Sequence, residues 1–305
     1  MAGSLKNLLK VSDKLDSVNI KLDNQAVLTG RLLAQINKTR EKEIINDIHQ
    51  SEFKVFSQWG DDGIIQFLIN YIDIPKNAEK FVEFGVENYT EANTRFLLIN
   101  NNWQGLIMDG SNDNMQYVKQ DDIYWRFQLE AKPVFITREN INELLTLGGM
   151  TGEIGLLHID IDGNDFFVWQ SIAVANPIIM IVEYNSVFGS DKPWSVPYDK
   201  AFVRSKYHHS NLYWGTSLLS LCDLAKEKGY GFIGCNSNGN NAFFVRNDKL
   251  KELKTLTPEQ GFVMSKFRES RDKDGKLTYL SGTSRLDVIK GLDIYNTRTQ
   301  QIEKI

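Results

Sequence analysis

Residues 5–50 carry apolar side chains at a regular spacing among polar ones and contain no proline. Steps of three and four residues alternate along one seam, which consists of Leu8, Val11, Leu15, Val18, Leu22, Gln25, Thr29, Leu32 and Ile36. This spacing is the a/d repeat of a coiled coil, in which Gln25 and Thr29 either weaken the seam or fix its register. The pattern predicts a long helix that either folds back on its own domain or, as the seam favours, forms a homo-oligomer.

From residue 56 onward, the pattern changes to an amphipathic helix that reaches about Ile72, and then to short apolar runs that alternate with helical segments. The predicted strands are 81–84, 105–108, 133–137, 156–162, 177–183, 230–234 and 242–245. One predicted helix begins at Thr90, and the others cover 114–119, 141–147, 166–173, 217–228 and 284–290. Near-continuous apolar strands separated by helices predict an α/β fold with a doubly wound, mostly parallel sheet, covered on both faces.

The same pattern divides the chain into three parts. Residues 1–50 are the helical extension, residues 51–250 the α/β domain, and residues 251–305 a charged, weakly patterned extension that we expect to pack on that domain. Within the domain, residues 185–214 form a long loop rich in aromatic, glycine and serine residues. The length and the aromatic rings of this loop predict an ordered substrate lid with stacking faces for a sugar ring or a nucleobase.

Composition excludes several classes of protein. Hydrophobic residues make up 42% of the 305 residues, which is ample for a sizeable core, and the net charge is −4 without a basic cluster, which argues against a nucleic-acid partner. Cys222 and Cys235 are the only cysteines, and we expect buried thiols in a reducing compartment. No stretch reaches the roughly 18 apolar residues of a membrane helix, and no signal peptide is evident. The expectation is a soluble, cytoplasmic protein without a membrane span.

Acidic residues stand at the ends of the predicted strands, namely Glu83, Asp109, Asp160, Asp162 and Glu183. Ligands of open α/β sheets bind outside the carboxyl ends of the strands, so this edge is the predicted site. Carboxylates gathered there repel one another unless a cationic ligand group, a metal ion or many hydrogen-bond donors relieve the charge. The alternative is that these acids cap helices and anchor loops.

The loop after the first strand, Gly85-Val-Glu-Asn-Tyr89, has one glycine and an added acid. A dinucleotide site needs the three glycines of G-x-G-x-x-G so that a helix N-terminus can approach a pyrophosphate. The loop therefore disfavours a nucleotide-sugar dehydrogenase or epimerase. Asp109 stands about two dozen residues after the glycine, where a carboxylate accepts ribose hydroxyls. A ligand with a sulfonium charge and a ribose but no phosphate fits this pattern, and S-adenosylmethionine is such a ligand.

Four motifs carry a resemblance to a known family: Glu83-Phe-Gly85, Asp109-Gly-Ser111, Ile159 to Asp165, and Val182 to Asn185. In this order they resemble the Rossmann-type class I S-adenosylmethionine-dependent O-methyltransferases, and within them the enzymes that tailor polysaccharides and antibiotics. The resemblance spans about residues 56–248. It implies a Rossmann-like methyltransferase fold, with the cofactor bound by Gln58, Asp62, Glu83, Gly85, Asn88, Asp109, Ser111, Thr137 or Arg138, and Asp160.

Methyl transfer to a hydroxyl needs a group that removes the proton of the acceptor. The resemblance implies a divalent cation, magnesium or manganese, held by Asp160, Asp162, Glu183 and Asn185. The alternative is a carboxylate network that hydrogen-bonds sugar hydroxyls directly. The candidate general bases are His208 and His209 in the lid and the acids Asp162 and Asp165. His158, by contrast, alternates within a buried strand and is expected to be a core histidine.

We therefore expect an S-adenosylmethionine-dependent O-methyltransferase that acts on a sugar hydroxyl. The resemblance and the polar residues between 184 and 214 favour a nucleotide-activated sugar or a bacterial surface polysaccharide unit. One alternative is another small polar hydroxyl or a phosphate-type acceptor. A second, from another class, is a ligand-binding assembly protein that acts through its coiled coil.

Overall fold

A seven-stranded sheet forms the centre of the computed structural model, which describes residues 2–305, with side chains from residue 14 onward except residue 16. Its strands stand in the order β3-β2-β1-β4-β5-β8-β7. They are β1 (Lys80–Phe84), β2 (Gln104–Asp109), β3 (Leu129–Pro133), β4 (Gly152–Ile159), β5 (Ala175–Glu183), β7 (Tyr230–Cys235) and β8 (Asn241–Arg246). β1 to β5 pair in parallel, and only β8 is antiparallel to its two neighbours. The predicted mostly parallel sheet is confirmed.

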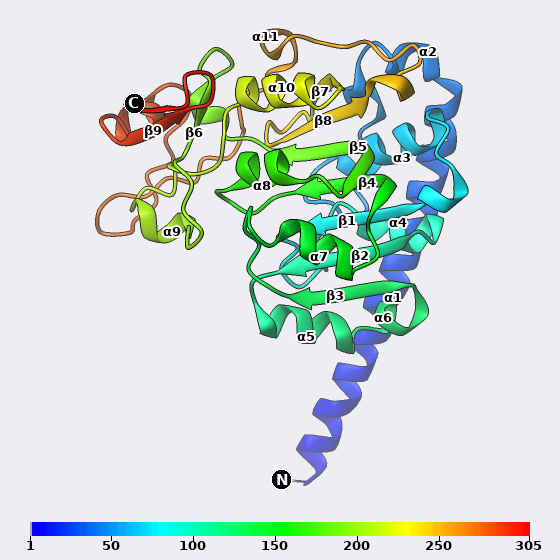
Figure 1. Ribbon diagram of the computed structural model, residues 1–305. Coiled ribbons are helices and arrows are strands. Elements are labelled where there is room, and N and C mark those ends of the chain that lie inside the picture. Colours follow the sequence, from blue (N-terminus) through cyan, green and yellow to red (C-terminus); the bar gives the residue numbers. More distant parts are fainter. Residues whose placement is uncertain (1) are drawn as a thin grey trace.

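Helices cover both faces of this sheet (Figure 1). One face carries α3 (Asp61–Tyr71) and α4 (Arg95–Asn101), and the other carries α7 (Ile141–Leu147), α8 (Asp165–Ser171) and α10 (Leu218–Glu227). Side chains of each strand alternate between the two layers, so that Phe81 enters one hydrophobic cluster and Val82 the other. The sheet is therefore doubly wound, as the apolar runs predicted.

Three predicted boundaries were wrong. The fourth strand, predicted as 156–162, is β4 at Gly152–Ile159 and includes two of the glycines that interrupt its apolar run. The third strand ends at Pro133 instead of beginning there, because Glu130 and Lys132 alternate with the buried Leu129 and Ala131 in an edge strand that lacks a continuous apolar run. The helix predicted from Thr90 begins at Arg95 after Thr94. Residues 85–93 form a loop instead, with left-handed backbone at several positions. The pattern predicted α5 (Asn112–Gln120). It did not predict three short helices, namely α6 (Asp122–Arg126), α9 (Arg204–Tyr207) and α11 (Pro258–Gly261).

The N-terminal helix α1 (Ala2–Thr39) presents two different faces. Val27 and Ala34 are buried on the domain, and a side chain at Gly30 would lie 2.6 Å from Val55 Cγ2. The opposite seam is exposed: Leu15, Val18, Leu22, Leu32 and Ile36 are each at least 50% exposed. The first half of α1 projects beyond the domain (Figure 1). The helix thus packs on its own domain by one face and leaves the heptad seam open.

Short segments complete the chain around these elements. After α1 come α2 (Glu41–Ile44) and the 3-10 turns Ile48–Ser51, Lys76–Ala78 and Asn247–Lys249. Within residues 2–305, no helix has both the length and the apolar character needed to span a membrane.

The lid and the C-terminal residues form a second, smaller hydrophobic core. The lid contains the 3-10 turn Ser186–Phe188, β6 (Trp194–Ser195) and α9 (Arg204–Tyr207), and the C-terminal part contains α12 (Ser284–Val288), β9 (Asp293–Asn296) and β10 (Gln301–Lys304). β6, β9 and β10 form a three-stranded sheet that the sequence did not predict, because strands of two to four residues are too short to show alternation. Phe188, Trp194, Trp214 and Ile294 pack in this core, so the lid is ordered.

The tight turn predicted at Gly85 is present and leaves no room for a side chain. The backbone φ of Gly85 is +72°, and a Cβ there would lie 1.6 Å from the carbonyl oxygen of Asp160. Gly149 has a similar φ of +68° but open space around it. Gly149→Ala is therefore the matched control, because it isolates the backbone strain, which costs about 1–2 kcal/mol.

We expect Gly85→Ala to lower the free energy of unfolding by about 3 kcal/mol or more, since the loops after β1 and β4 must move apart. Urea denaturation of both variants and the wild type measures the difference. Equal losses for Gly85→Ala and Gly149→Ala would contradict the close approach of the two loops.

Candidate active site

A cavity of about 930 Å³ lies at the carboxyl ends of the central strands. It is lined by many of the residues predicted from the sequence, namely Gln58, Glu83, Gly85, Asn88, Asp109, Asp160, Asp162, Glu183 and Asn185. The parallel strands β1, β2, β4 and β5 place these residues at one edge of the sheet, as expected for an α/β fold. This cavity is the candidate active site.

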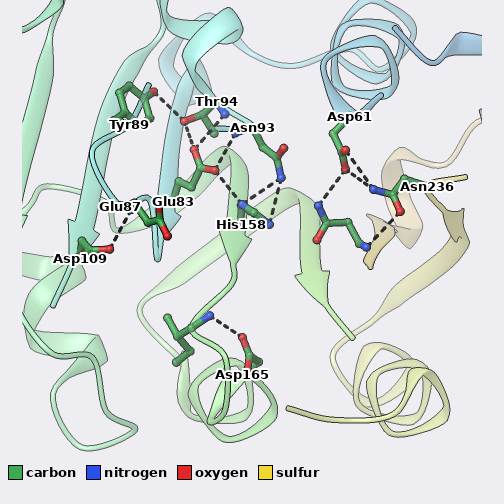
Figure 2. Close-up of polar contacts among 12 residues, drawn as sticks. Asp61, Glu83, Glu87, Tyr89, Asn93, Thr94, Asp109, His158, Asp165 and Asn236 are labelled. Atoms are coloured by element: carbon green, nitrogen blue, oxygen red, sulfur yellow. Dashed lines mark hydrogen bonds and ion pairs between the residues drawn. The ribbon is translucent and has the colours of Figure 1, made fainter. Parts of the chain in front are cut away.

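Glu83 is a buried carboxylate at the inner end of the cavity. It accepts hydrogen bonds from the backbone N–H groups of Asn93 (2.9 Å) and Thr94 (3.0 Å) and from the Thr94 hydroxyl. His158 Nδ1 lies 3.0 Å from the same carboxylate, as Figure 2 shows. Both oxygens of Glu83 are therefore engaged with the protein, and the residue shapes the loop that precedes α4.

Glu83 and His158 shift each other's pKa. Burial alone raises the pKa of Glu83, but the hydrogen bond and charge of His158 outweigh it and lower the pKa below its ordinary value. Burial alone lowers the pKa of His158, but Glu83, together with the charges of Asp160 and Asp61, outweighs it and raises the pKa. Each group thus favours the charged form of the other, and the pair is a buried ion pair between β1 and β4. The expected core position of His158 is confirmed.

Asp109 stands at the end of β2 beside the loop that follows β1. Its carboxylate accepts hydrogen bonds from the backbone N–H groups of Glu87 (2.9 Å) and Ser111 (2.7 Å). Glu87 has left-handed backbone, with φ of +47°, which turns its N–H group toward Asp109 (Figure 2). Asn88 lines the cavity nearby, whereas Ser111 does not line it and instead caps α5 by accepting from the N–H group of Asn114.

The loop after β3 contributes apolar residues that the sequence reasoning missed. Phe135 and Ile136 line the cavity, whereas the predicted Thr137 and Arg138 do not. Thr137 exchanges hydrogen bonds with Asn140, and Arg138 pairs with Glu139. The sequence placed Phe135 inside the predicted strand 133–137, which hid its position in the loop after β3.

Asp160 and Glu183 lie together in the cavity. Burial, followed by the charge of Asp162, raises the pKa of Asp160 to about 7. Burial, followed by the charge of Asp160, raises the pKa of Glu183 well above its ordinary value. Glu183 Oε2 is buried and has no hydrogen-bond partner among the described residues. The two carboxyl groups therefore favour holding a proton between them.

Asp162 is the one predicted base that lines the cavity. It has left-handed backbone, with φ of +56°, and its carboxylate is exposed. Arg204 of the lid donates to it from Nη1 at 2.7 Å. This ion pair joins the loop after β4 to the lid across the cavity.

Other predicted residues serve the loops around the cavity. Asp165 accepts from the N–H groups of Ile161 and Gly163, both at 2.9 Å, and Asp62 accepts from three successive N–H groups of residues 55–57. Neither acid lines the cavity. His208 and His209 also lie outside it, and the Nδ1 atom of His208 is 2.7 Å from the Ser210 hydroxyl.

The predicted metal ligands do not form a cation site. The amide nitrogen of Asn185 donates to the carbonyl oxygens of Leu212 (3.0 Å) and Trp214 (2.9 Å), and its oxygen accepts from the N–H group of Val187. Across the described part of the chain, no group of three or more His, Cys, Asp or Glu side chains is placed to hold a metal ion. Asn185 instead ties the end of the lid to β5, and these residues do not fit the predicted magnesium or manganese ion.

Comparison with known proteins gives structural neighbours only. No family model matches the chain, and no curated protein matches it. An S-adenosylmethionine-dependent methyltransferase from Clostridium acetobutylicum ATCC 824 is 9% identical over 68% of this chain and 98% of that chain, with a TM-score of 0.40. An O-methyltransferase family protein from Burkholderia thailandensis is 12% identical over 72% and 71%, with a TM-score of 0.36.

The N-terminal domain of EvdMO1 with SAH bound is 12% identical over 54% of this chain and 72% of that chain, with a TM-score of 0.35. Two of these three proteins are described as methyltransferases, and the third has SAH bound. The identities and scores are low, so the case for a function rests on the site of this chain itself.

The ion pair of Glu83 and His158 predicts a pH-dependent stability. The raised pKa of His158 means that its charged form adds stability that is fully present below its ordinary value of 6.5 and is lost as the pH rises through the folded-state pKa. We expect His158→Gln to lower the free energy of unfolding by roughly 3 kcal/mol at about pH 6, and by less at about pH 9.

Urea denaturation at several pH values measures this difference. His209→Gln is the control, because His209 is exposed and lies outside the cavity. A loss for His158→Gln that stays constant with pH would contradict the charged pair.

Proposed function

We propose that this chain transfers a methyl group from S-adenosylmethionine to a hydroxyl of a sugar, on a nucleotide-activated sugar or a surface polysaccharide unit. The observation that carries the proposal is the acid-lined cavity at the carboxyl ends of β1, β2 and β4. Glu87, Asp109, Asp160 and Asp162 line it without a glycine-rich phosphate loop. This edge of the cavity suits a cofactor with a sulfonium charge and a ribose, and it disfavours a cofactor whose pyrophosphate would lie at the loop after β1.

The proposed cofactor position follows the strands. Asp109 keeps acceptor capacity for a ribose hydroxyl, because a carboxylate has about four lone-pair sites. Two of these accept the N–H groups of Glu87 and Ser111, and a third accepts the Asn114 amide at 3.5 Å. Phe135 and Ile136 offer apolar surface for the adenine ring beside it. The methionine part then lies near Gly85 and Asn88, toward the acids of β4 and β5.

The proposed acceptor lies on the far side of the cavity, under the lid. Asn164, Ser186 and Asn240 line that side with hydrogen-bonding groups, and Trp214 and Phe202 add aromatic rings. Polar groups combined with aromatic faces suit a sugar, whose hydroxyls and C–H face need both.

One carboxylate stands where the acceptor hydroxyl would lose its proton. Asp162 lines the cavity and is exposed in it. We assign the role of general base to Asp162 in preference to Asp165, His208 or His209, which lie outside the cavity. Glu183 is not assigned this role, because burial and the charge of Asp160 raise its pKa and favour its protonated form.

Calorimetry with S-adenosylhomocysteine and with NAD tests the cofactor. We expect the wild type to bind S-adenosylhomocysteine and Asp109→Asn to bind it about 10- to 100-fold more weakly, since a hydrogen bond to a charged group contributes about 1.5–3 kcal/mol. Asp113→Asn is the matched control, because Asp113 is exposed on α5 outside the cavity. Binding of NAD alone would end the methyltransferase proposal.

A second candidate is an assembly protein that binds a ligand in its α/β domain and acts through the N-terminal helix. The exposed heptad seam of α1 favours self-association of the chain, whichever function the domain has. Because Val27, Ala34 and Asn37 of the same helix are buried on the domain, the seam is better tested by substitution than by deletion of residues 1–50.

We expect the wild type to form an oligomer and Leu22→Glu to form a monomer, because a buried charge in the seam opposes pairing. Ile20→Glu is the control, because Ile20 is 55% exposed, as Leu22 is at 56%, but stands off the seam. Light scattering coupled to size exclusion measures the mass. A monomeric wild type, or an unchanged mass for Leu22→Glu, would contradict self-association through the seam.

A further inference from the structure

The far wall of the cavity is built by the chain after residue 260. Ser265, Phe267, Glu269 and Arg285 line the cavity from this part. The Tyr184 hydroxyl at the end of β5 donates to the carbonyl oxygen of Val263 at 2.5 Å. The N–H groups of Ser265 and Lys266 donate to the Ser186 hydroxyl and to the Asn238 carbonyl oxygen, both at 3.0 Å. These bonds join the wall to the end of the central sheet.

Arg285 is the buried cation of this wall. It is 3% exposed, and its guanidinium donates to neutral atoms of the wall, at 3.3 Å to the Phe267 carbonyl oxygen and 2.8 Å to the Met264 sulfur. Two further contacts, to the carbonyl oxygens of Ser265 and Gly282, are long at 3.5 Å. Among the described residues, no carboxylate forms an ion pair with Arg285. Its charge is thus held in the cavity wall without a counter-ion.

Other arginines with little exposed surface are neutralised. Arg95, which is 7% exposed, pairs with Asp121 at 3.3 Å. Arg204, the other arginine that lines the cavity, pairs with Asp162 at 2.7 Å and faces Glu269 at 3.8 Å. A buried charge without a partner is unfavourable, and a bound anion relieves it. Of the two arginines that line the cavity, Arg285 is therefore the one whose charge a bound anion would neutralise.

We propose that Arg285 binds an oxyanion, a phosphate or a carboxylate group, that the acceptor molecule carries. The planar guanidinium fork matches both groups with two parallel hydrogen bonds. One comes from the Nη1 N–H group that the described residues of the wall leave free, and the other from the Nη2 N–H group whose contact with the Ser265 carbonyl is long, at 3.5 Å. Burial lowers the pKa of Arg285, in keeping with a poorly hydrated cation that gains from an anion. That the bound molecule is the methyl acceptor rests on the proposed function. The anion site itself is inferred from the burial of Arg285 and its lack of a counter-ion among the described residues.

Three sugars that share one ring test the site: glucose 1-phosphate, glucuronic acid and glucose. Calorimetry measures their binding to the full chain with and without S-adenosylhomocysteine. We expect at least one of the two anionic sugars to bind about 30-fold or more tightly than glucose, and Arg285→Met to abolish that preference. A preference for glucose 1-phosphate assigns phosphate as the anion, and a preference for glucuronic acid assigns a carboxylate.

Arg298→Met is the matched control. It removes the same charge from an exposed arginine that pairs with Asp223 outside the cavity. Arg285→Lys keeps the charge but loses the fork, and we expect it to retain part of the preference. In the absence of sugar, we expect Arg285→Met to keep the melting temperature of the wild type or to raise it, because an uncompensated buried charge has been removed.

Anionic sugars that bind no better than glucose would overturn the proposal, as would equal losses for Arg285→Met and Arg298→Met. If Arg285→Met does not fold, Arg285 has a structural role, and Arg285→Lys becomes the test of the anion site. A preference for anionic sugars that Arg285→Lys retains in full would then contradict binding of the anion by the guanidinium fork. Binding of S-adenosylhomocysteine without an anion preference removes the anion site alone. An anion preference without binding of S-adenosylhomocysteine removes the methyltransferase proposal alone.

Discussion

The buried ion pair of Glu83 and His158 joins the two central strands of the sheet at the edge where the cavity opens. The two residues are register partners on β1 and β4, so the pair spans the strand boundary at the middle of the fold. The same carboxylate accepts the N–H groups of Asn93 and Thr94 and so determines where α4 begins. A substitution of Glu83 or His158 therefore affects the ends of β1 and β4, the loop 85–93 and the start of α4 together. These segments form one end of the cavity.

Carboxylates that hold backbone N–H groups recur around the cavity. Asp62 holds residues 55–57, Asp165 holds the loop after β4, and Asp109 holds the loops after β1 and β2. Irregular loops at a buried edge need partners for their N–H groups, and a carboxylate satisfies several at once. Among the strand-end acids, Glu83 and Asp109 thus anchor loops, as the alternative reading of these acids expected, and Asp162 and Glu183 line the cavity. Asp62 and Asp165, which were predicted as a cofactor contact and a general base, anchor loops as well.

The sequence predicted most of the central sheet because its strands, except the edge strand β3, are short apolar runs bounded by turn residues. It predicted the strand-end acids because parallel strands gather their carboxyl ends at one edge. It could not predict the far wall. Phe267 lies in a stretch without a periodic pattern, and Arg285, although it stands in the predicted helix 284–290, lines the cavity in a wall held by contacts with residues such as Tyr184 and Asn238. One charged residue in a charged segment gives no sign that its side chain will be buried without a counter-ion.

The acids of the cavity also set a limit on catalysis by the proposed reaction. Methyl transfer from a sulfonium removes the positive charge of the cofactor, so a strongly negative cavity stabilises the bound cofactor more than the transition state. A proton held between Asp160 and Glu183, favoured by the raised pKa of both groups, reduces that excess negative charge. The pairing of Arg204 with Asp162 reduces it further while leaving the carboxylate in the cavity. The cavity can therefore attract a cationic cofactor without holding it so strongly that the loss of its charge is opposed.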